Sequence, residues 1–440
     1  MLRCLLICHL ALCLLLVSAG PARAQSDPPT SPLVGNMIFI HPDGASAASF
    51  AAVRNLLVGP DGDLHWDRLP AMALYRGHLS DSLTATSNAG ATIHAYGIKV
   101  PGPSYGLDGE EPITDAEGNS LSVAHQAIRA GLPVGVVNSG TSTEPGTGCF
   151  LTSVPKRSMH DEIAVQLIES GAEVILGGGE QFFLPEGVKG RHGVGVRADD
   201  RNVIEEARQK GYHVVFTREE LADLPDDVTR LLGIFAANQT FNDKPEEVLA
   251  QVGLPLYWSH APTVAEMTQA ALTVLGRHDK RFLLVVEEEG TDNFGNKNNA
   301  KGKLEALRRA DEAIGVARAF VADHPETMIL TASDSEAGGM YLQGVGLVDG
   351  EPPAALPERD VNGAPMDGQE GTGTAPFIAA PDRNGNAWPF AITWAARDDV
   401  TGGILVRAEG LNAHLVRGNI DNTEIPALMR LTLFGRSMPE

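Results

Sequence analysis

The chain has 440 residues, a formal net charge of −22 at pH 7 and a sequence pI of about 5.0. This length can bury a large core, which suits one big α/β domain with insertions or two ordinary domains. The acidic charge excludes long-range attraction to nucleic acid or anionic membranes, so specificity for a phosphate would have to come from local cations.

The first 24 residues have the features of a secretory signal peptide. Arg3 supplies a positive charge, residues 4–18 are almost all apolar, and Ala22-Arg23-Ala24 ends in an A-x-A cleavage pattern. An uncleaved membrane anchor is the alternative, but the apolar run is short for a membrane span. We therefore expect a mature catalytic domain of residues 25–440 that is secreted or periplasmic, without a stable membrane anchor.

Removal of this segment would change the cysteine content. Cys4, Cys8 and Cys13 lie within it, so the mature chain would keep only Cys149. An intrachain disulfide and a thiolate metal cluster would then be excluded. We expect the packed core alone to hold the fold together.

Short apolar, β-branched segments alternate along the chain with helical segments. This alternation predicts an α/β fold with a mostly parallel sheet covered by helices on both faces. The expected strands are 36–41, 134–138, 173–177, 213–216, 283–287 and 328–332. Residues 302–323 carry apolar side chains at helical spacing, which predicts an amphipathic helix between the last two strands. Residues 341–387 are rich in Gly, Pro, Asp and Asn without a sustained period, and we expect an irregular insertion or lid there.

Acidic residues end or follow three of these strands. Asp43 comes after the first strand, Glu287 and Asp292 after the fifth, and Asp334 after the last. The carboxyl ends of parallel strands are where α/β sheets place their ligands. Carboxylates that converge there repel one another unless cations neutralise them, and hard oxygen ligands suit divalent metals. The spacing alone leaves two alternatives, a metal site or acids that cap the following helices.

Residues 84–92, T-A-T-S-N-A-G-A-T, combine small side chains with hydroxyl groups. Small side chains allow close approach of the backbone, and a hydroxyl at a helix N-terminus can face an anion. Ser87 is therefore a candidate nucleophile. Taken alone, the segment is more typical of an N-cap followed by a tightly packed Ala/Gly helix.

These features belong to a longer series of short motifs. In chain order they are Asp43-Gly44, T-S-N-A-G-A-T with G-I-K at 97–99, V-G-V-V at 134–137, Arg157, V-I-L-G-G-G at 174–179, E-x4-D at 287–292, T-A-S-D-S-E-A-G-G at 331–339 and R-G-N-I-D-N-T-E-I at 417–425. Over roughly residues 36–425, the series resembles the alkaline phosphatases. The resemblance implies a three-layer α/β sandwich, a small phosphate-ester substrate rather than nucleic acid, and a homodimer, which is common in the family.

The resemblance also implies the residues that act on the substrate. Ser87 matches the serine that attacks phosphorus and forms a phosphoseryl intermediate. Arg157 matches the arginine that grips two phosphate oxygens, for which a planar fork of donors is suited. The implied reaction is hydrolysis of a phosphate monoester in two in-line steps at alkaline pH.

The metal ligands follow from the resemblance in the same way. Asp43 matches the carboxylate that bridges two metals, and Glu287 matches a ligand of a third, magnesium-type position. Asp292 and Asp334 match ligands of the two catalytic metals. Glu144 falls where the family has Ser or Thr at the magnesium position.

Three zinc-binding histidines of the family are missing from their places. These positions hold Asn296, Ser335 and, depending on a one-residue shift, Asp399 or Val400, while Thr86 replaces the Asp that usually precedes the nucleophile. Oxygen ligands of this kind favour harder ions. We expect two to three divalent ions, first Mg²⁺, with Zn²⁺, Ca²⁺ or Mn²⁺ as alternatives. A degenerate metal site in a non-catalytic, phosphate-binding relative is the competing explanation.

Other assignments stay open at this stage. His41 points the same way as Asp43 on a strand and could replace a metal ligand, or it could be a buried structural histidine. His94, His260 and His414 lie in segments with an expected structural role. Residues 153–157 fit the loose S-x-P-x-R pattern of the related sulfatases. A sulfatase and a phosphodiesterase of the same superfamily are therefore alternative functions.

Overall fold

The structure is a computed structural model that describes residues 33–114 and 121–435. These residues belong to one contact unit, Pro32–Glu440. The predicted signal peptide lies outside the described residues. In the described part, no helix has the length and apolar character needed to cross a membrane. Cys149 is buried and free.

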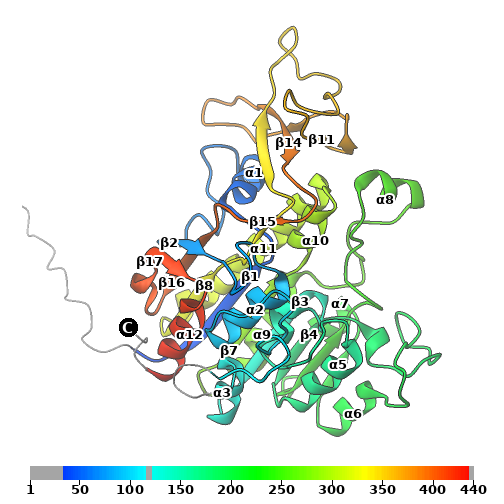
Figure 1. Ribbon diagram of the computed structural model, residues 1–440, viewed down its shortest axis with the longest axis vertical. Helices are drawn as coiled ribbons and strands as arrows, with labels where there is room; N and C mark the ends of the chain where they lie inside the picture. Colours follow the sequence, from blue (N-terminus) through cyan, green and yellow to red (C-terminus); the bar gives the residue numbers. More distant parts are fainter. Residues whose placement is uncertain (1–32, 115–120, 436–440) are drawn as a thin grey trace, which may run out of the picture. The chain divides into compact units, whose positions relative to one another are not determined.

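A ten-stranded sheet lies at the centre of the described chain, in the order β17-β2-β16-β8-β1-β7-β3-β4-β6-β5 (Figure 1). Its strands are β1 (Asn36–Pro42), β2 (Ala71–Arg76), β3 (Val134–Thr141), β4 (Val174–Gly178), β5 (His213–Val215), β6 (Leu231–Ile234), β7 (Leu283–Glu288), β8 (Thr327–Thr331), β16 (Leu405–Gly410) and β17 (Arg417–Asp421). β16 runs antiparallel to both of its neighbours, and the other pairs are parallel. The six strands predicted from the sequence are confirmed as β1, β3, β4, β5, β7 and β8.

Helices cover both faces of this sheet. Alternate residues of its strands point to opposite faces, and the apolar side chains on each face pack against a layer of helices. Met37 and Phe39 of β1 join one core cluster, whereas Ile38 and Ile40 join the other. The first cluster includes residues of α2 (Ser87–Tyr96), α3 (Val123–Arg129), α5 (His160–Glu169), α6 (Val203–Gln209) and α12 (Glu424–Phe434). The second includes residues of α1 (Ala47–Val58), α9 (Val264–Gly276) and α11 (Ala300–Asp323). The predicted three-layer, mostly parallel α/β architecture is confirmed.

Helix α11 illustrates how the sequence builds these layers. The Asn299 side chain accepts a hydrogen bond from the backbone N–H of Gly302, which caps the first turn. Leu304, Leu307 and Ile314 recur at helical spacing and are buried against the sheet. The amphipathic helix predicted over 302–323 is therefore confirmed, with two further residues at its start.

The remaining helices are short connections at the ends of strands. They are α4 (Pro145–Gly148), η1 (Glu180–Phe182), α7 (Arg218–Ala222), α8 (Glu246–Val252), α10 (Gly290–Asn296) and η2 (Ala413–Leu415). Two of them adjoin candidate site residues: α4 follows β3 and Glu144, and α10 follows β7 and carries Asp292.

A second, smaller sheet contains much of the segment expected to be irregular. It consists of β10 (Met340–Gly344), β11 (Met366–Gly368), β12 (Gly371–Thr372), β13 (Phe377–Ile378) and β14 (Pro389–Trp394), and β15 (Asp399–Val400) pairs separately with β9 (Glu336–Ala337). Inside it, Trp394 Nε1 donates a hydrogen bond of 2.6 Å to Asp367. The segment 341–387 thus carries short strands between long loops, and its assignment as a lid stays a prediction.

Candidate active site

Three adjacent strands, β8, β1 and β7, bring acidic residues together at their carboxyl ends. Asp43 follows β1, Asp334 follows β8, Glu287 lies within β7, and Asp292 lies on α10 rather than directly after a strand. Together with Glu289, these residues form a group of five buried acids, which we call the carboxylate cluster. The convergence expected from the sequence is present in the structure.

His41 is part of the same arrangement. Its Nδ1 lies 2.9 Å from the Ala332 carbonyl oxygen, and its Nε2 lies 3.3 Å from Asp43 Oδ1 and 4.0 Å from Glu287 Oε1. His41, Asp43 and Glu287 each offer one ligand atom, and these atoms lie within 4.8 Å of one another. The structure therefore places His41 where a ligand would stand, which the sequence left open.

Glu289 is a site residue that the sequence analysis missed. Its carboxylate, with those of Asp43 and Asp292, forms a second group whose ligand atoms lie within 4.8 Å of one another. Strand alternation could not have indicated it, because β7 ends at Glu288 and Glu289 has helical backbone angles at the N-cap of α10. Glu287 and Glu289 face the cluster, while Glu288 between them is bound by Tyr257 Oη at 2.9 Å and Ser139 Oγ at 2.7 Å.

Several oxygens of the cluster are buried without a hydrogen-bond partner among the described residues. They are both carboxylate oxygens of Asp43, both of Asp334, Glu287 Oε1 and Glu289 Oε2. A buried polar atom without a partner carries a large desolvation cost, and a bound cation would offset it. The donor set is hard oxygen with one imidazole, so the residues present fit divalent metal ions of the magnesium or calcium type.

The pKa values of the acidic residues in the cluster also agree with binding of divalent metal ions. Burial raises the pKa of Glu287 to about 8, and burial and the neighbouring carboxylates hold the pKa of Glu289, Asp292 and Asp334 well above the usual range. Burial opposes but does not prevent a lowered pKa at Asp43, which results from the adjacent His41 ring, 3.3 Å away. So many carboxylates cannot all ionise in one buried place unless cations join them.

Helix α2 points its N-terminus at this cluster. Thr86 caps it, with its side chain accepting a hydrogen bond of 3.3 Å from the Ala89 N–H. Ser87 is the first helical residue and lies beside Asp43, whose pKa its hydroxyl lowers, after the larger effects of burial and His41. Gly90 makes the approach possible, since a Cβ there would lie 2.5 Å from Asp334 Oδ2.

Arg157 and Glu144 form an ion pair near the cluster. Arg157 Nη2 lies 2.9 Å from Glu144 Oε2, and the Arg157 side chain is 47% exposed. Burial lowers the pKa of Arg157, but Glu144, Glu289 and Asp292 raise it overall. Glu144 precedes α4, in which Gly146 is needed because a Cβ would lie on Glu287 Oε1.

The residues that replace the family histidines lie next to the cluster. Asn296 Nδ2 donates hydrogen bonds to Asp292 Oδ1 at 3.1 Å and to Asp399 Oδ1 at 3.0 Å. Of the two alternatives at the third position, the structure thus places Asp399 beside Asn296. Ser335 follows Asp334, and its buried Oγ has no partner among the described residues.

The residues of the alternative assignments have local partners. Ser153, the serine of the sulfatase-like pattern, donates a hydrogen bond of 2.8 Å to the Gly106 carbonyl. His94 Nε2 lies 2.6 Å from Tyr75 Oη in the core. Both contacts favour structural roles for these two residues.

Comparisons with known proteins place this geometry in context. The family described as alkaline phosphatase matches residues 34–434. A membrane-bound alkaline phosphatase of Bombyx mori is 28% identical over 338 residues, which cover 68% of this chain and 59% of that protein. A repressible alkaline phosphatase of Saccharomyces cerevisiae is 29% identical over 336 residues, covering 69% and 55%. The chain thus matches less than two thirds of the length of either relative.

Among solved structures, an alkaline phosphatase of Thermus thermophilus superimposes with a TM-score of 0.71 at 25% identity. The match covers 97% of each chain. A cold-active alkaline phosphatase of a Shewanella species superimposes with a TM-score of 0.68 at 20% identity, covering 90% of this chain and 99% of that one. These matches agree with the three-layer fold described above.

Proposed function

Because the chain belongs to the alkaline phosphatase family, we propose that it is a metal-dependent phosphate monoester hydrolase with Ser87 as its nucleophile. The observation that carries this proposal is the approach of Ser87 to the carboxylate cluster. A hydroxyl at a helix N-terminus stands beside buried oxygens that lack partners. This arrangement suits phosphoryl transfer, in which positioning and charge stabilisation do most of the catalytic work.

The chain's own residues have separate tasks in this reaction. The Ser87 oxygen attacks phosphorus and releases its proton to solvent, while the bond from phosphorus to the leaving oxygen breaks and that oxygen takes up a proton from solvent. Arg157 uses one nitrogen on Glu144, and the rest of its fork is available for two phosphate oxygens. Water then attacks phosphorus, breaks its bond to the Ser87 oxygen and releases phosphate.

The metals would be held by two overlapping sets of residues. Asp43, Glu289 and Asp292 form one set, with Asn296 and Asp399 alongside, while His41, Asp43 and Glu287 form the other. Asp334 and Ser335 extend the cluster on the side of Ser87. When bound, divalent ions supply Lewis acidity and neutralise the charge that develops on the reacting oxygens.

Turnover of p-nitrophenyl phosphate tests this proposal. We would strip the protein of metal and add back zinc, magnesium, calcium and manganese one at a time. Activity restored best by a hard ion is the expected result, because oxygen ligands replace the family histidines. Restoration by zinc alone would contradict the expected metal preference, and no turnover with any ion would contradict the function itself.

Two further parts of the proposal concern location and assembly. We propose that the mature protein acts outside the cytoplasm, from the A-x-A pattern at 22–24, and that it forms a homodimer, as the family commonly does. N-terminal sequencing and light scattering of the exported protein test these points. A retained leader or a monomer would contradict them.

A further inference from the structure

A polar residue of α10 lies between two carboxylates of the proposed metal site. Asn293 follows Asp292 on this helix and is half-buried. One end of its side-chain amide lies 3.2 Å from Asp292 Oδ2 and 3.3 Å from Glu289 Oε1. Asn293 has no task in the proposed reaction, although it contacts two of the three acids that form one candidate metal group.

The Gln239 side chain determines which end of the Asn293 amide faces the carboxylates. With nitrogen at that end, the amide donates to both carboxylates, and the Asn293 oxygen accepts a hydrogen bond of 2.7 Å from Gln239 Nε2. In the opposite orientation the oxygen would face only acceptors, and the nitrogen would face the Gln239 donor. The hydrogen-bond network therefore assigns the first orientation, in which all three polar contacts are made.

These hydrogen bonds leave one oxygen of Glu289 for a ligand. Asn293 donates to Oε1, whereas Oε2 is buried without a partner among the described residues. Asp292 also accepts from Asn296, whose Nδ2 lies 3.1 Å from Oδ1 and 3.3 Å from Oδ2. A carboxylate oxygen can accept more than one contact, so Asp292 can still bind a cation. One neutral amide thus connects two ligands of the same metal group and restricts their rotation.

Repulsion between the two carboxylates explains why a neutral donor suits this position. Glu289 and Asp292 are both buried, and they belong to one group whose ligand atoms lie within 4.8 Å of one another. Without a bound ion, like charges would push the two side chains apart. A lysine would neutralise them but would also take the place of a metal ion. The Asn293 amide instead donates to both carboxylates and adds no charge that competes with a cation.

The loop that carries Gln239 is attached to the backbone beside Glu289. Next to Gln239, Thr240 donates from its backbone N–H and from Oγ1 to the Ser139 carbonyl, at 3.2 and 2.5 Å. Ser139 Oγ in turn accepts a hydrogen bond of 3.0 Å from the Glu289 N–H. These contacts fix the distance between the loop and the start of α10.

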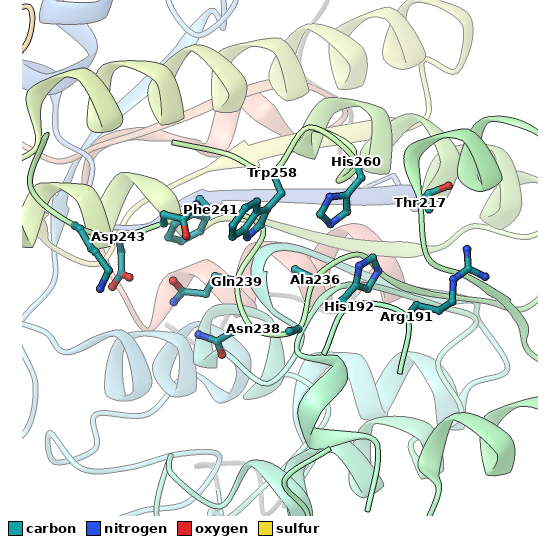
Figure 2. Close-up of a pocket in the computed structure, with 13 residues that line it drawn as sticks. Arg191, His192, Thr217, Ala236, Asn238, Gln239, Phe241, Asp243, Trp258 and His260 are labelled. Carbon is teal, nitrogen blue, oxygen red and sulfur yellow. The ribbon is translucent and has the colours of Figure 1, made fainter. Parts of the chain in front are cut away.

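The same loop also packs against α10 itself. The Phe241 ring lies 5.3 Å from that of Phe294, the residue after Asn293. Figure 2 shows Gln239 and Phe241 in the wall of the cavity that this loop lines. Because ring packing already holds the loop against the helix, Gln239 can orient the Asn293 amide without a large ordering cost.

We propose that Asn293 is a positioning residue of the metal site, oriented by Gln239, and that it holds Glu289 and Asp292 ready for one divalent ion. The inference rests on the proposed metal-dependent function and gives neither amide a contact with substrate. Loss of a partner that orients metal ligands typically lowers metal affinity by about 10–100-fold. The expected effect of Asn293 is therefore on metal binding first, and on turnover only through it.

Calorimetric binding of magnesium to the metal-free protein, repeated with calcium and manganese, tests this role. Asn293→Ala removes the donor and should weaken binding by about 10–100-fold. Asn238→Ala is the matched control in the same loop, since Asn238 is exposed and its Oδ1 accepts from Gln181 at 3.0 Å. It should keep the affinity within about two-fold of the wild-type value. Equal affinities of the wild type and Asn293→Ala would overturn the inference.

Gln239→Glu tests the orientation of the amide by the sign of its effect. The substitution replaces the donor at Nε2 by an oxygen, so the Asn293 amide should turn its oxygen towards the two acids, and magnesium binding should weaken several-fold. An added negative charge alone would strengthen the binding of a cation, so the two explanations predict opposite signs. An affinity at or above the wild-type value would overturn the orienting role of Gln239. This variant also keeps the inference testable if Asn293→Ala does not fold.

The metal dependence of turnover separates the inference from the proposed function. In Asn293→Ala the magnesium concentration for half-maximal turnover of p-nitrophenyl phosphate should rise by the same factor as Kd, and saturating magnesium should restore kcat to within about five-fold. A loss of kcat that saturating magnesium does not restore, with unchanged affinity, would overturn the positioning role.

The binding experiment decides the inference even without activity. If the wild-type protein binds magnesium but hydrolyses no phosphate ester, the proposed function fails, whereas the comparison of affinities still tests Asn293. A wild-type protein that binds none of the three ions would overturn the inference. Weaker binding in both Asn293→Ala and Gln239→Glu, with Asn238→Ala unchanged, is the result that supports it.

Discussion

Two buried charged regions lie next to each other at the edge of the sheet and differ in how their charges are satisfied. In the first, the carboxylate cluster, at least six buried oxygens lack a partner among the described residues. In the second, the fully buried Lys303 ammonium donates to Gly44 O at 2.8 Å, Glu336 Oε1 at 2.7 Å and Ala337 O at 2.7 Å. We call this second region the Lys303 network.

The two regions share their chain segments. Gly44 follows Asp43, Glu336 stands two residues after Asp334, and the Glu336 carboxylate also accepts from Ser49 Oγ at 3.0 Å. Burial therefore does not distinguish a functional charge from a structural one, whereas the presence of partners does. The Lys303 network holds the loops that present Asp43 and Asp334, and the carboxylate cluster keeps its unpartnered oxygens for ligands.

The largest expected effect concerns the nucleophile beside the carboxylate cluster. Ser87→Ala removes the attacking oxygen, so turnover of p-nitrophenyl phosphate should fall by more than about 10⁴-fold. Ser153→Ala is the control, because that serine donates its hydrogen bond to the Gly106 carbonyl; it should keep turnover within a few-fold. A larger loss in Ser153→Ala than in Ser87→Ala would favour the sulfatase-like pattern.

The free energy of unfolding should be more sensitive to a substitution in the Lys303 network than to one in a nearby exposed ion pair. Lys303→Met leaves Glu336 buried without its cation, which should lower the free energy of unfolding by about 3–5 kcal/mol. Lys301→Met is the matched control two residues away, where the ion pair with Glu370 is exposed, and it should cost less than about 1 kcal/mol. Chemical denaturation of both variants measures this difference, and equal costs would break the comparison.

The stability of the metal-free protein should depend on pH, because the carboxylate cluster, unlike the Lys303 network, has oxygens without partners in the described part of the chain. The pKa of Glu287 is raised by burial to about 8, and that of His41 is raised to about 8 by Asp43, against the effect of burial. Both groups bind protons more tightly in the folded state than in the unfolded state. Their stabilisation is therefore present at low pH and is lost as pH rises through about 8.

Metal-free protein should accordingly lose about 2 kcal/mol or more of stability between about pH 5 and pH 9. Thermal unfolding at constant ionic strength measures this loss. Saturating magnesium should make the dependence shallower, because bound cations stabilise the ionised carboxylates. A flat profile without metal would indicate that the cluster carries no such proton linkage.

The smallest expected effect concerns the preference for one metal ion over another, which the oxygen ligands around the carboxylate cluster should determine. Asn296→His adds an imidazole where Asn296 now joins Asp292 to Asp399, and it should raise the affinity for zinc relative to magnesium by about ten-fold. Competitive metal binding followed by calorimetry measures the ratio. An unchanged ratio would mean that Asn296 lies outside the coordination of the metal.

Much of the fold could be predicted from the sequence because its signals are local. Six strands of the main sheet are short, buried, apolar runs, and α11 has a regular helical period, so each was visible within a dozen or so residues. Four strands, β2, β6, β16 and β17, were missed. Exposed and polar residues break the apolar run in β2, β16 and β17, whereas β6 is a buried apolar run of only 4 residues. Their place in the sheet depends on pairing with distant strands.

The candidate site divides in the same way. The sequence by itself placed Ser87 in a small-residue helical segment and put Asp43, Glu287 and Asp334 at strand ends, because these features depend on near neighbours. Only the tertiary structure brought Glu289 towards Asp43 and joined Asn296 to Asp399 across 103 residues. The physical reason is that side chains far apart in the chain meet only through strand order and register, which the packing of the whole core decides.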